Sequence, residues 1–176
     1  LTTAIAIVLF VGIAALGLYL YSGRPDLIGV DTRAAAHPDM ETMIGKITAH
    51  LKQHPEDQRG WEMLGRTYMA LGRYPEAAGA LERLYALAGE DATVLVRYAD
   101  ALAMAAGGKL GGRPAELVNR ALELEPGHRT ALWLAGMAAM ERGEPATAVN
   151  YWQTLLPLLE DENTRAEVAQ LIENAG

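Results

Sequence analysis

The sequence repeats itself at a fixed interval of 71 residues. Four small or apolar residues each have a counterpart at this distance: Gly65 and Gly136, Gly72 and Gly143, Ala77 and Ala148, Leu81 and Trp152. Self-similarity at a fixed period is the signature of a protein built from stacked structural units. An interval of 71 equals two periods of 34 plus three extra residues, and 34 residues is the length of one helix–turn–helix repeat. The spacing therefore predicts a third unit between the two that match.

The middle unit can be located by the same spacing. Four of its residues follow their counterparts at a distance of 34: Leu95 after Trp61, Tyr98 after Leu64, Ala99 after Gly65, and Leu102 after Tyr68. The three extra residues fall in the glycine-rich stretch 107–112, and Pro55 and Pro126 stand where a closing proline precedes a new unit. The pattern predicts three tetratricopeptide repeats, over 58–91, 92–128 and 129–162.

Packing accounts for the residue types at the recurring positions. Gly65 and Gly136 are expected to be small because the paired helices of a unit cross closely there. Large apolar side chains are expected to fill the space between units, namely Trp61, Leu64, Leu81 and Trp152. Prolines suit the first turn of a helix, so Pro75, Pro114 and Pro145 predict where the second helices begin.

Two further helices are predicted at the ends of the repeats. Residues 39–54 carry apolar residues near helical spacing and form a partial leading helix. Residues 163–175 are predicted to be a capping helix, which a stack needs to shield its last apolar face. The expected fold is all-α: a tetratricopeptide (TPR) helical-repeat superhelix over residues 39–176.

The N-terminal 22 residues contain no charged residue. About 20 apolar residues span the hydrocarbon core of a bilayer, and Tyr19 and Tyr21 lie where aromatic rings prefer the headgroup level. The sequence predicts a transmembrane helix over 1–23 and a linker over 24–38. The alternative is the core of a signal peptide, which would be shorter and preceded by positive charge.

Composition argues against several functions. The chain has no cysteine, and its net charge of −7 disfavours nucleic-acid binding. No catalytic motif is found, and the stretch 107–112 lacks the Ser or Thr that a phosphate-binding loop needs after Gly-Lys. His50 and His54 lie four residues apart but lack an evident third ligand. We therefore expect a non-enzymatic protein without a cofactor or a metal site.

Several local motifs resemble one known family. They are the apolar helix with Leu18 to Leu20 and Gly23 to Leu27, the Trp61 to Arg66 unit, the Gly111 to Pro114 loop, and the Ala135 to Ala138 and Tyr151-Trp152 segments. Together they resemble the membrane-anchored tetratricopeptide subunit of bacterial System I cytochrome c maturation, the CcmI type. The likeness covers nearly the whole chain.

The resemblance implies a fragment that runs from the second membrane helix of such a subunit onward. It also implies an inner-membrane protein with a single span here and a periplasmic TPR domain. That domain would bind apocytochrome c, by its C-terminal amphipathic helix, and present it to the membrane subunits of the haem lyase complex. The related nitrite-reductase maturation proteins carry similar units.

The family fold further implies that the first helix of each unit lines a concave groove. The expected groove residues are Arg59, Glu62, Arg66, Met69, Val96, Asp100, Met104, Trp133, Met137 and Met140, with Ala70, Thr93, Ala103, Thr130 and Glu141 at equivalent positions. Methionine adapts to varied apolar partners, so the groove is expected to hold an amphipathic helix. The alternative is that these side chains only pack within the repeats.

Three functions remain open at this stage: an apocytochrome-holding assembly subunit, a general periplasmic scaffold, and a cytoplasm-facing adaptor for C-terminal peptides. The third is disfavoured, because adaptors that hold a terminal carboxylate use Lys and Asn where this chain has Glu62, Asp100 and Trp133.

Overall fold

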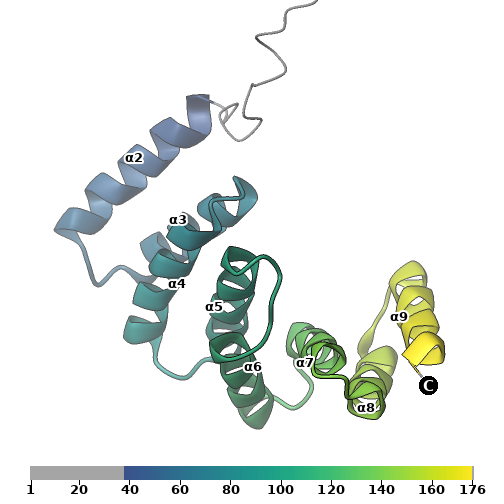
Figure 1. Cartoon of the computed structure of the whole chain (residues 1–176). Coiled ribbons are helices and arrows are strands. Elements are labelled where there is room, and N and C mark those ends of the chain that lie inside the picture. The colour runs from purple at the N-terminus through teal and green to yellow at the C-terminus, as the bar shows by residue number, and fades with distance from the viewer. Residues whose placement is uncertain (1–37, 176) are drawn as a thin grey trace, which may run out of the picture. The chain divides into compact units, whose positions relative to one another are not determined.

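The computed structural model describes residues 38–175, and every regular element among them is helical (Figure 1). The helices are α2 (Pro38–Gln53), α3 (Gln58–Ala70), α4 (Tyr74–Ala88), α5 (Ala92–Ala105), α6 (Arg113–Leu124), α7 (Arg129–Glu141), α8 (Pro145–Leu155), the short 3-10 helix η2 (Leu156–Leu158) and α9 (Glu162–Ala175). The predicted all-α repeat architecture is confirmed.

The predicted bounds differ from these helices by one residue at three places, one of which is the end of α2 at Gln53 instead of residue 54. Pro38, expected to be the last linker residue, is the first residue of α2, where its fixed φ angle suits the first turn. Helix α9 begins at Glu162, one residue before the predicted capping helix. The predicted membrane helix 1–23 and the rest of the linker lie outside the described residues, and no helix within 38–175 has the length and apolar character needed to cross a bilayer.

Each helix packs mainly against the helix before it and the helix after it (Figure 1). The pairs α3/α4, α5/α6 and α7/α8 lie within the three predicted repeats. Gly72 and Gly143 occupy the turns inside the first and third pairs with φ angles of 68° and 71°, which glycine adopts without strain. The prolines Pro75, Pro114 and Pro145 all stand in the first turn of a second helix, as predicted.

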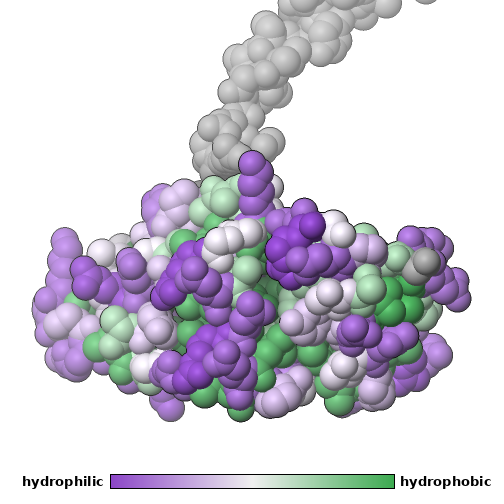
Figure 2. All heavy atoms as spheres, turned by 60° about the horizontal axis from the view of Figure 1, so that its bottom comes forward, coloured by the Kyte–Doolittle hydropathy of each residue, from purple (hydrophilic) through white to green (hydrophobic). Residues whose placement is uncertain are grey.

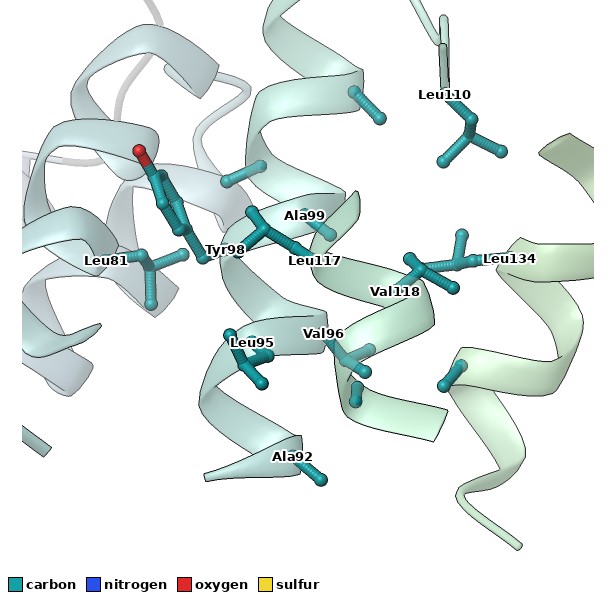
Figure 3. Close-up of a cluster of buried hydrophobic side chains, with 14 of the residues drawn as sticks. Leu81, Ala92, Leu95, Val96, Tyr98, Ala99, Leu110, Leu117, Val118 and Leu134 are labelled. Atoms are coloured by element: carbon teal, nitrogen blue, oxygen red, sulfur yellow. The ribbon is translucent and has the colours of Figure 1, made fainter. Parts of the chain in front are cut away.

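The main core runs through the middle of the stack (Figure 3). Buried side chains from consecutive pairs meet there, including Leu81 of α4, Leu95 and Ala99 of α5, Leu117 of α6 and Leu134 of α7. Since one contiguous cluster draws on four helices, neighbouring repeats stabilise one another by sharing apolar surface. A second cluster around Trp152 joins α7, α8 and α9.

Two close helix crossings account for the glycines that recur at the interval of 71. A Cβ atom at Gly65 would lie 2.8 Å from Cγ of Leu81, and one at Gly136 would lie 2.5 Å from Cε2 of Trp152. Both distances are shorter than real side chains tolerate, so only glycine fits at either position. The sequence prediction for these two glycines is confirmed.

The glycine-rich stretch 107–112 forms the loop between α5 and α6, as expected. Leu110 buries its side chain in the main core, and its backbone N–H donates to both carboxylate oxygens of Glu141, at 3.0 and 3.1 Å. The extra residues of the middle repeat are therefore held against α7. Glu141 was expected in the groove, but its carboxylate is used for this internal contact.

Candidate peptide-binding face

The predicted groove residues lie on three helices, α3, α5 and α7. On α3 they are Arg59, Glu62, Arg66 and Met69; on α5, Val96, Asp100 and Met104; on α7, Trp133, Met137 and Met140. Three methionines expose between 37% and 40% of their surface: Met104, Met137 and Met140. Arg59 and Arg66 are exposed as well. These side chains are accessible to a partner.

Val96 is a correction to the predicted groove. It exposes only 3% of its surface and belongs to the main core, where Figure 3 shows it on α5 beside buried residues of α6. Ala103 is buried in the same cluster. The middle helix α5 has a repeat on each side, and these neighbours cover Val96 and Ala103, whereas Met104 near the end of the same helix stays exposed.

In the half of the face on α3 and α5, most of the candidate residues are charged, and the exceptions are Met69, Val96 and Met104. Glu62 forms an ion pair with Arg97, a residue of α5 that sequence reasoning did not select. The pair bridges two repeats and borders a hollow that we call the α3/α5 hollow, lined by Gln58, Arg59, Glu62, Leu84, Ala88, Asp91, Thr93, Val94 and Arg97. The sequence position of Arg97, one residue after Val96, does not indicate that it pairs with Glu62. Which side chains meet between two helices depends on how the helices cross.

A neighbouring hollow on the same half contains an unpaired carboxylate. It is lined by Arg66, Met69, Leu81, Arg97 and Asp100. Asp100 is partly buried, and its carboxylate has no hydrogen bond or ion pair within residues 38–175. Burial without a partner disfavours the ionised form and raises the pKa of Asp100 above its ordinary value.

This raised pKa gives a prediction about stability. The folded chain holds the proton of Asp100 more tightly than the unfolded chain, so stability falls as pH rises from 3.8 through the folded-state pKa. Above that range the cost of the buried charge is constant. We expect Asp100→Asn to melt at a higher temperature than the parent chain at pH 7 and at the same temperature near pH 3. A melting difference that persisted unchanged at pH 3 would contradict this account.

The half of the face on α7 is apolar. Met137 and Met140 lie there, and Trp133 is partly buried with its ring centroid 6.4 Å from that of Trp152. In the view of Figure 2, apolar residues form patches that hydrophilic residues interrupt. The candidate face is therefore divided into a charged half and an apolar half, which sequence position alone did not distinguish.

A hollow between α7 and α9 continues the apolar half. It is lined by Arg129, Thr130, Trp133, Leu155, Leu159, Thr164 and Val168, and we call it the α7/α9 hollow. Apart from Trp133 and Thr130, sequence reasoning missed these residues, because it assigned α9 only a capping role.

The histidine pair lies away from this face. His50 Nε2 is 2.9 Å from Oδ2 of Asp57, a carboxylate that sequence reasoning did not place near it, and His54 lies beside Glu56. No group of three potential metal ligands is present within residues 38–175.

Solved structures share this architecture. MamA matches with a TM-score of 0.60 at 19% identity, over 78% of this chain and 86% of MamA. The TPR2B domain of yeast Sti1, solved in a complex titled with pHsp70, matches with a TM-score of 0.59 at 21% identity, over 67% of this chain and 94% of that one. At these identities the likeness shows the fold alone, and that fold is the helical-repeat architecture of tetratricopeptide domains.

Sequence relatives identify the family. The chain belongs to the family described as the TPR domain of cytochrome c-type biogenesis protein H, which it matches over residues 27–166. Cytochrome c-type biogenesis protein CycH of Pseudomonas aeruginosa is 35% identical over 163 residues, which are 92% of this chain and 40% of CycH. CcmH of Escherichia coli, of the same description, is 29% identical over 75% of this chain and 38% of CcmH. The chain thus spans about two fifths of these relatives.

Proposed function

We propose that this chain is the apocytochrome-holding part of a cytochrome c maturation subunit of the CcmI type. It binds apocytochrome c and presents it to the membrane subunits of the haem lyase complex, without catalysing a reaction itself. The observation that carries the proposal is the exposure of three methionines on the first helices of two repeats, α5 and α7, in a chain that belongs to a cytochrome c biogenesis family. Membership of the family supports a role in cytochrome c maturation, and the exposed methionines support binding of an apolar segment of the apocytochrome.

The chemistry of the face favours an unfolded or partly helical partner. Met104, Met137 and Met140 offer flexible apolar side chains, which adapt to different apolar surfaces. An apocytochrome exposes apolar segments that the mature protein buries around its haem. The partner's own folding therefore withdraws the surface that this face binds, so capture and release need no energy from this chain.

We further propose the membrane arrangement that the sequence suggests. Residues 1–23 anchor the chain in the bacterial inner membrane, residues 24–37 link the anchor to α2, and the TPR domain lies in the periplasm. The apolar, uncharged N-terminal stretch and the family resemblance support this arrangement. In this proposal the chain corresponds to the part of a longer subunit from its second membrane helix onward.

A second function has one observation in its favour. NrfG of Escherichia coli, named a subunit of the formate-dependent nitrite reductase complex, is 23% identical over 80% of this chain and 71% of NrfG. The alternative is accordingly a general periplasmic TPR scaffold, including one that serves maturation of a nitrite-reductase-type cytochrome.

Binding of the two forms of a cytochrome tests the proposal. Calorimetry with the full chain in lipid nanodiscs is expected to show binding of a c-type apocytochrome and at least tenfold weaker binding of the holocytochrome. The reason is that haem attachment and folding bury the apolar segment. Equal affinity for both forms would overturn the apo-selective role and favour a scaffold for folded proteins.

The methionines provide a matched control in the same experiment. Met137→Ala with Met140→Ala should weaken apocytochrome binding by about tenfold, because truncated side chains at a buried hot spot lose contact area. Met43 on α2 is exposed to 40%, the same fraction as Met140, but lies outside the predicted groove. Met43→Ala should leave the affinity unchanged.

A further inference from the structure

The α7/α9 hollow and the α3/α5 hollow occupy equivalent places in the repeat. All seven lining residues of the α7/α9 hollow have a counterpart in the α3/α5 hollow at the interval of 71: Gln58 and Arg129, Arg59 and Thr130, Glu62 and Trp133, Leu84 and Leu155, Ala88 and Leu159, Thr93 and Thr164, Arg97 and Val168. The first helix of the neighbouring unit forms one wall in each case, α5 in one hollow and α9 in the other. Helix α9 therefore holds the place of a further repeat's first helix.

The chemistry of the two hollows differs most at two of these positions, which are charged in one hollow and apolar in the other. In the α3/α5 hollow, Glu62 and Arg97 neutralise each other in an ion pair between the walls. In the α7/α9 hollow, the same positions hold Trp133 and Val168. Leu155 and Val168 expose 1% and 0% of their surface, while Trp133 and Leu159 are partly exposed. The Glu62–Arg97 ion pair thus bridges the α3/α5 hollow, whereas the α7/α9 hollow has apolar side chains at its opening.

Arg129 is the only charged residue among those that line the α7/α9 hollow. It is exposed, and no carboxylate within residues 38–175 pairs with it. Most arginines in the described part do have a carboxylate partner: Arg73, Arg97, Arg113, Arg120, Arg142 and Arg165. An unpaired guanidinium beside an apolar opening complements a ligand that combines an apolar side chain with a carboxylate.

We propose that the α7/α9 hollow is a socket for one large apolar side chain of the bound apocytochrome segment, and that Arg129 pairs with an Asp or Glu about one helical turn from that side chain. This inference rests on the proposed function, because it specifies where the apocytochrome's segment is anchored. It gives α9 a part in binding in addition to covering the end of the core. The charge-bridged α3/α5 hollow does not accept such a side chain.

Cysteine cross-linking can locate the anchored side chain, since the natural chain has no cysteine that could react instead. Thr164 and Thr93 are both exposed threonines at equivalent rims of the two hollows. The full chain with Thr164→Cys is mixed with C-terminal-helix peptides of an apocytochrome c, in which each large apolar residue is replaced in turn by cysteine. We expect one peptide position to form a disulfide with Thr164→Cys, at least tenfold faster than with Thr93→Cys.

A double-mutant cycle then tests the charge pair. Arg129→Gln should weaken binding of the peptide about three- to tenfold, and the loss should disappear when the acidic residue one turn from the cross-linked position is changed to Gln. Arg83→Gln is the matched control, because Arg83 is also exposed without a carboxylate partner within 38–175 but lies on α4 away from the hollow. It should not change the affinity.

The outcomes separate the socket from the proposed function. Apocytochrome that binds with equal cross-linking at Thr164→Cys and Thr93→Cys would overturn the socket and leave the function in place. Absence of any apocytochrome or peptide binding would overturn both. Cross-linking of Thr164→Cys, in the absence of peptide, to a cysteine introduced in residues 1–22 or to a second copy of the chain would assign the hollow to that occupant and overturn the proposal.

Discussion

Replacing Trp152 by alanine is expected to lower the free energy of unfolding by about 3–5 kcal/mol, the usual range for a large aromatic residue in a close-packed core. Trp152 exposes 1% of its surface and is the largest fully buried side chain in residues 38–175. It holds together the second core cluster, which contains Leu132, Leu155 and Val168 from three helices. The loss should appear as an earlier transition in thermal or urea unfolding of the full chain, followed by the helical circular dichroism signal.

Two other substitutions calibrate this result. Trp152 Nε1 is buried without a hydrogen-bond partner within the described residues, so Trp152→Phe removes an unsatisfied donor while it keeps most of the apolar volume. It should cost much less than Trp152→Ala. Trp61→Ala should also cost less, because Trp61 is only partly buried, even though the substitution removes the hydrogen bond that Trp61 Nε1 donates to the carbonyl of Pro55 at 2.8 Å. An unchanged unfolding curve for Trp152→Ala would mean that the repeat register at α8 is wrong.

The sequence predicts the helical framework well because the constraints are local and repeated. Glycine at a close crossing, proline in a first turn and apolar side chains at helical spacing each report directly on a helix pair. Spacing alone matched Gly65 with Gly136 and Leu81 with Trp152, and the structure places Gly65 against Leu81 and Gly136 against Trp152. These residue types recur at the repeat period because the two helices of each unit pack against each other in the same way.

The candidate face is less predictable, because it depends on contacts between repeats. Position in the unit selected Val96 and Trp133 as equivalents, but Val96 is covered by neighbours and Trp133 is partly open. The Glu62–Arg97 pair and the contact of Glu141 with the loop at Leu110 both join different repeats. The spacing of residues predicts the helix face on which a side chain lies. It does not predict which residue of the neighbouring repeat that side chain contacts.

Helix α9 was predicted only in part from the sequence. Its apolar residues predicted a cap, and Val168 does contribute to the second core cluster. The interval of 71 extends one helix further than the sequence analysis followed it, to Thr164 and Val168, and thereby marks α9 as one wall of a hollow. A longer self-comparison would have detected this signal.

Gly136→Ala is expected to destabilise the fold by about 1–3 kcal/mol or more, although alanine is intrinsically the better helix former. The added Cβ would lie 2.5 Å from Cε2 and 2.7 Å from Cδ1 of Trp152. Those atoms belong to a rigid indole ring that is itself enclosed, so the helices α7 and α8 must separate to relieve the overlap. Chemical unfolding of the full chain measures the change.

Gly79 supplies the control of opposite sign, and Trp152 supplies a test of the cause. Gly79 lies inside α4, and no atom comes within 4 Å of a Cβ built there, so Gly79→Ala should stabilise the chain by about 0.5–1 kcal/mol through helix propensity. If the indole causes the cost at Gly136, then Gly136→Ala should cost clearly less when Trp152→Leu has already removed the overlapping atoms. Equal costs in the two backgrounds, or a stabilising Gly136→Ala, would show that α7 and α8 do not cross closely at this glycine.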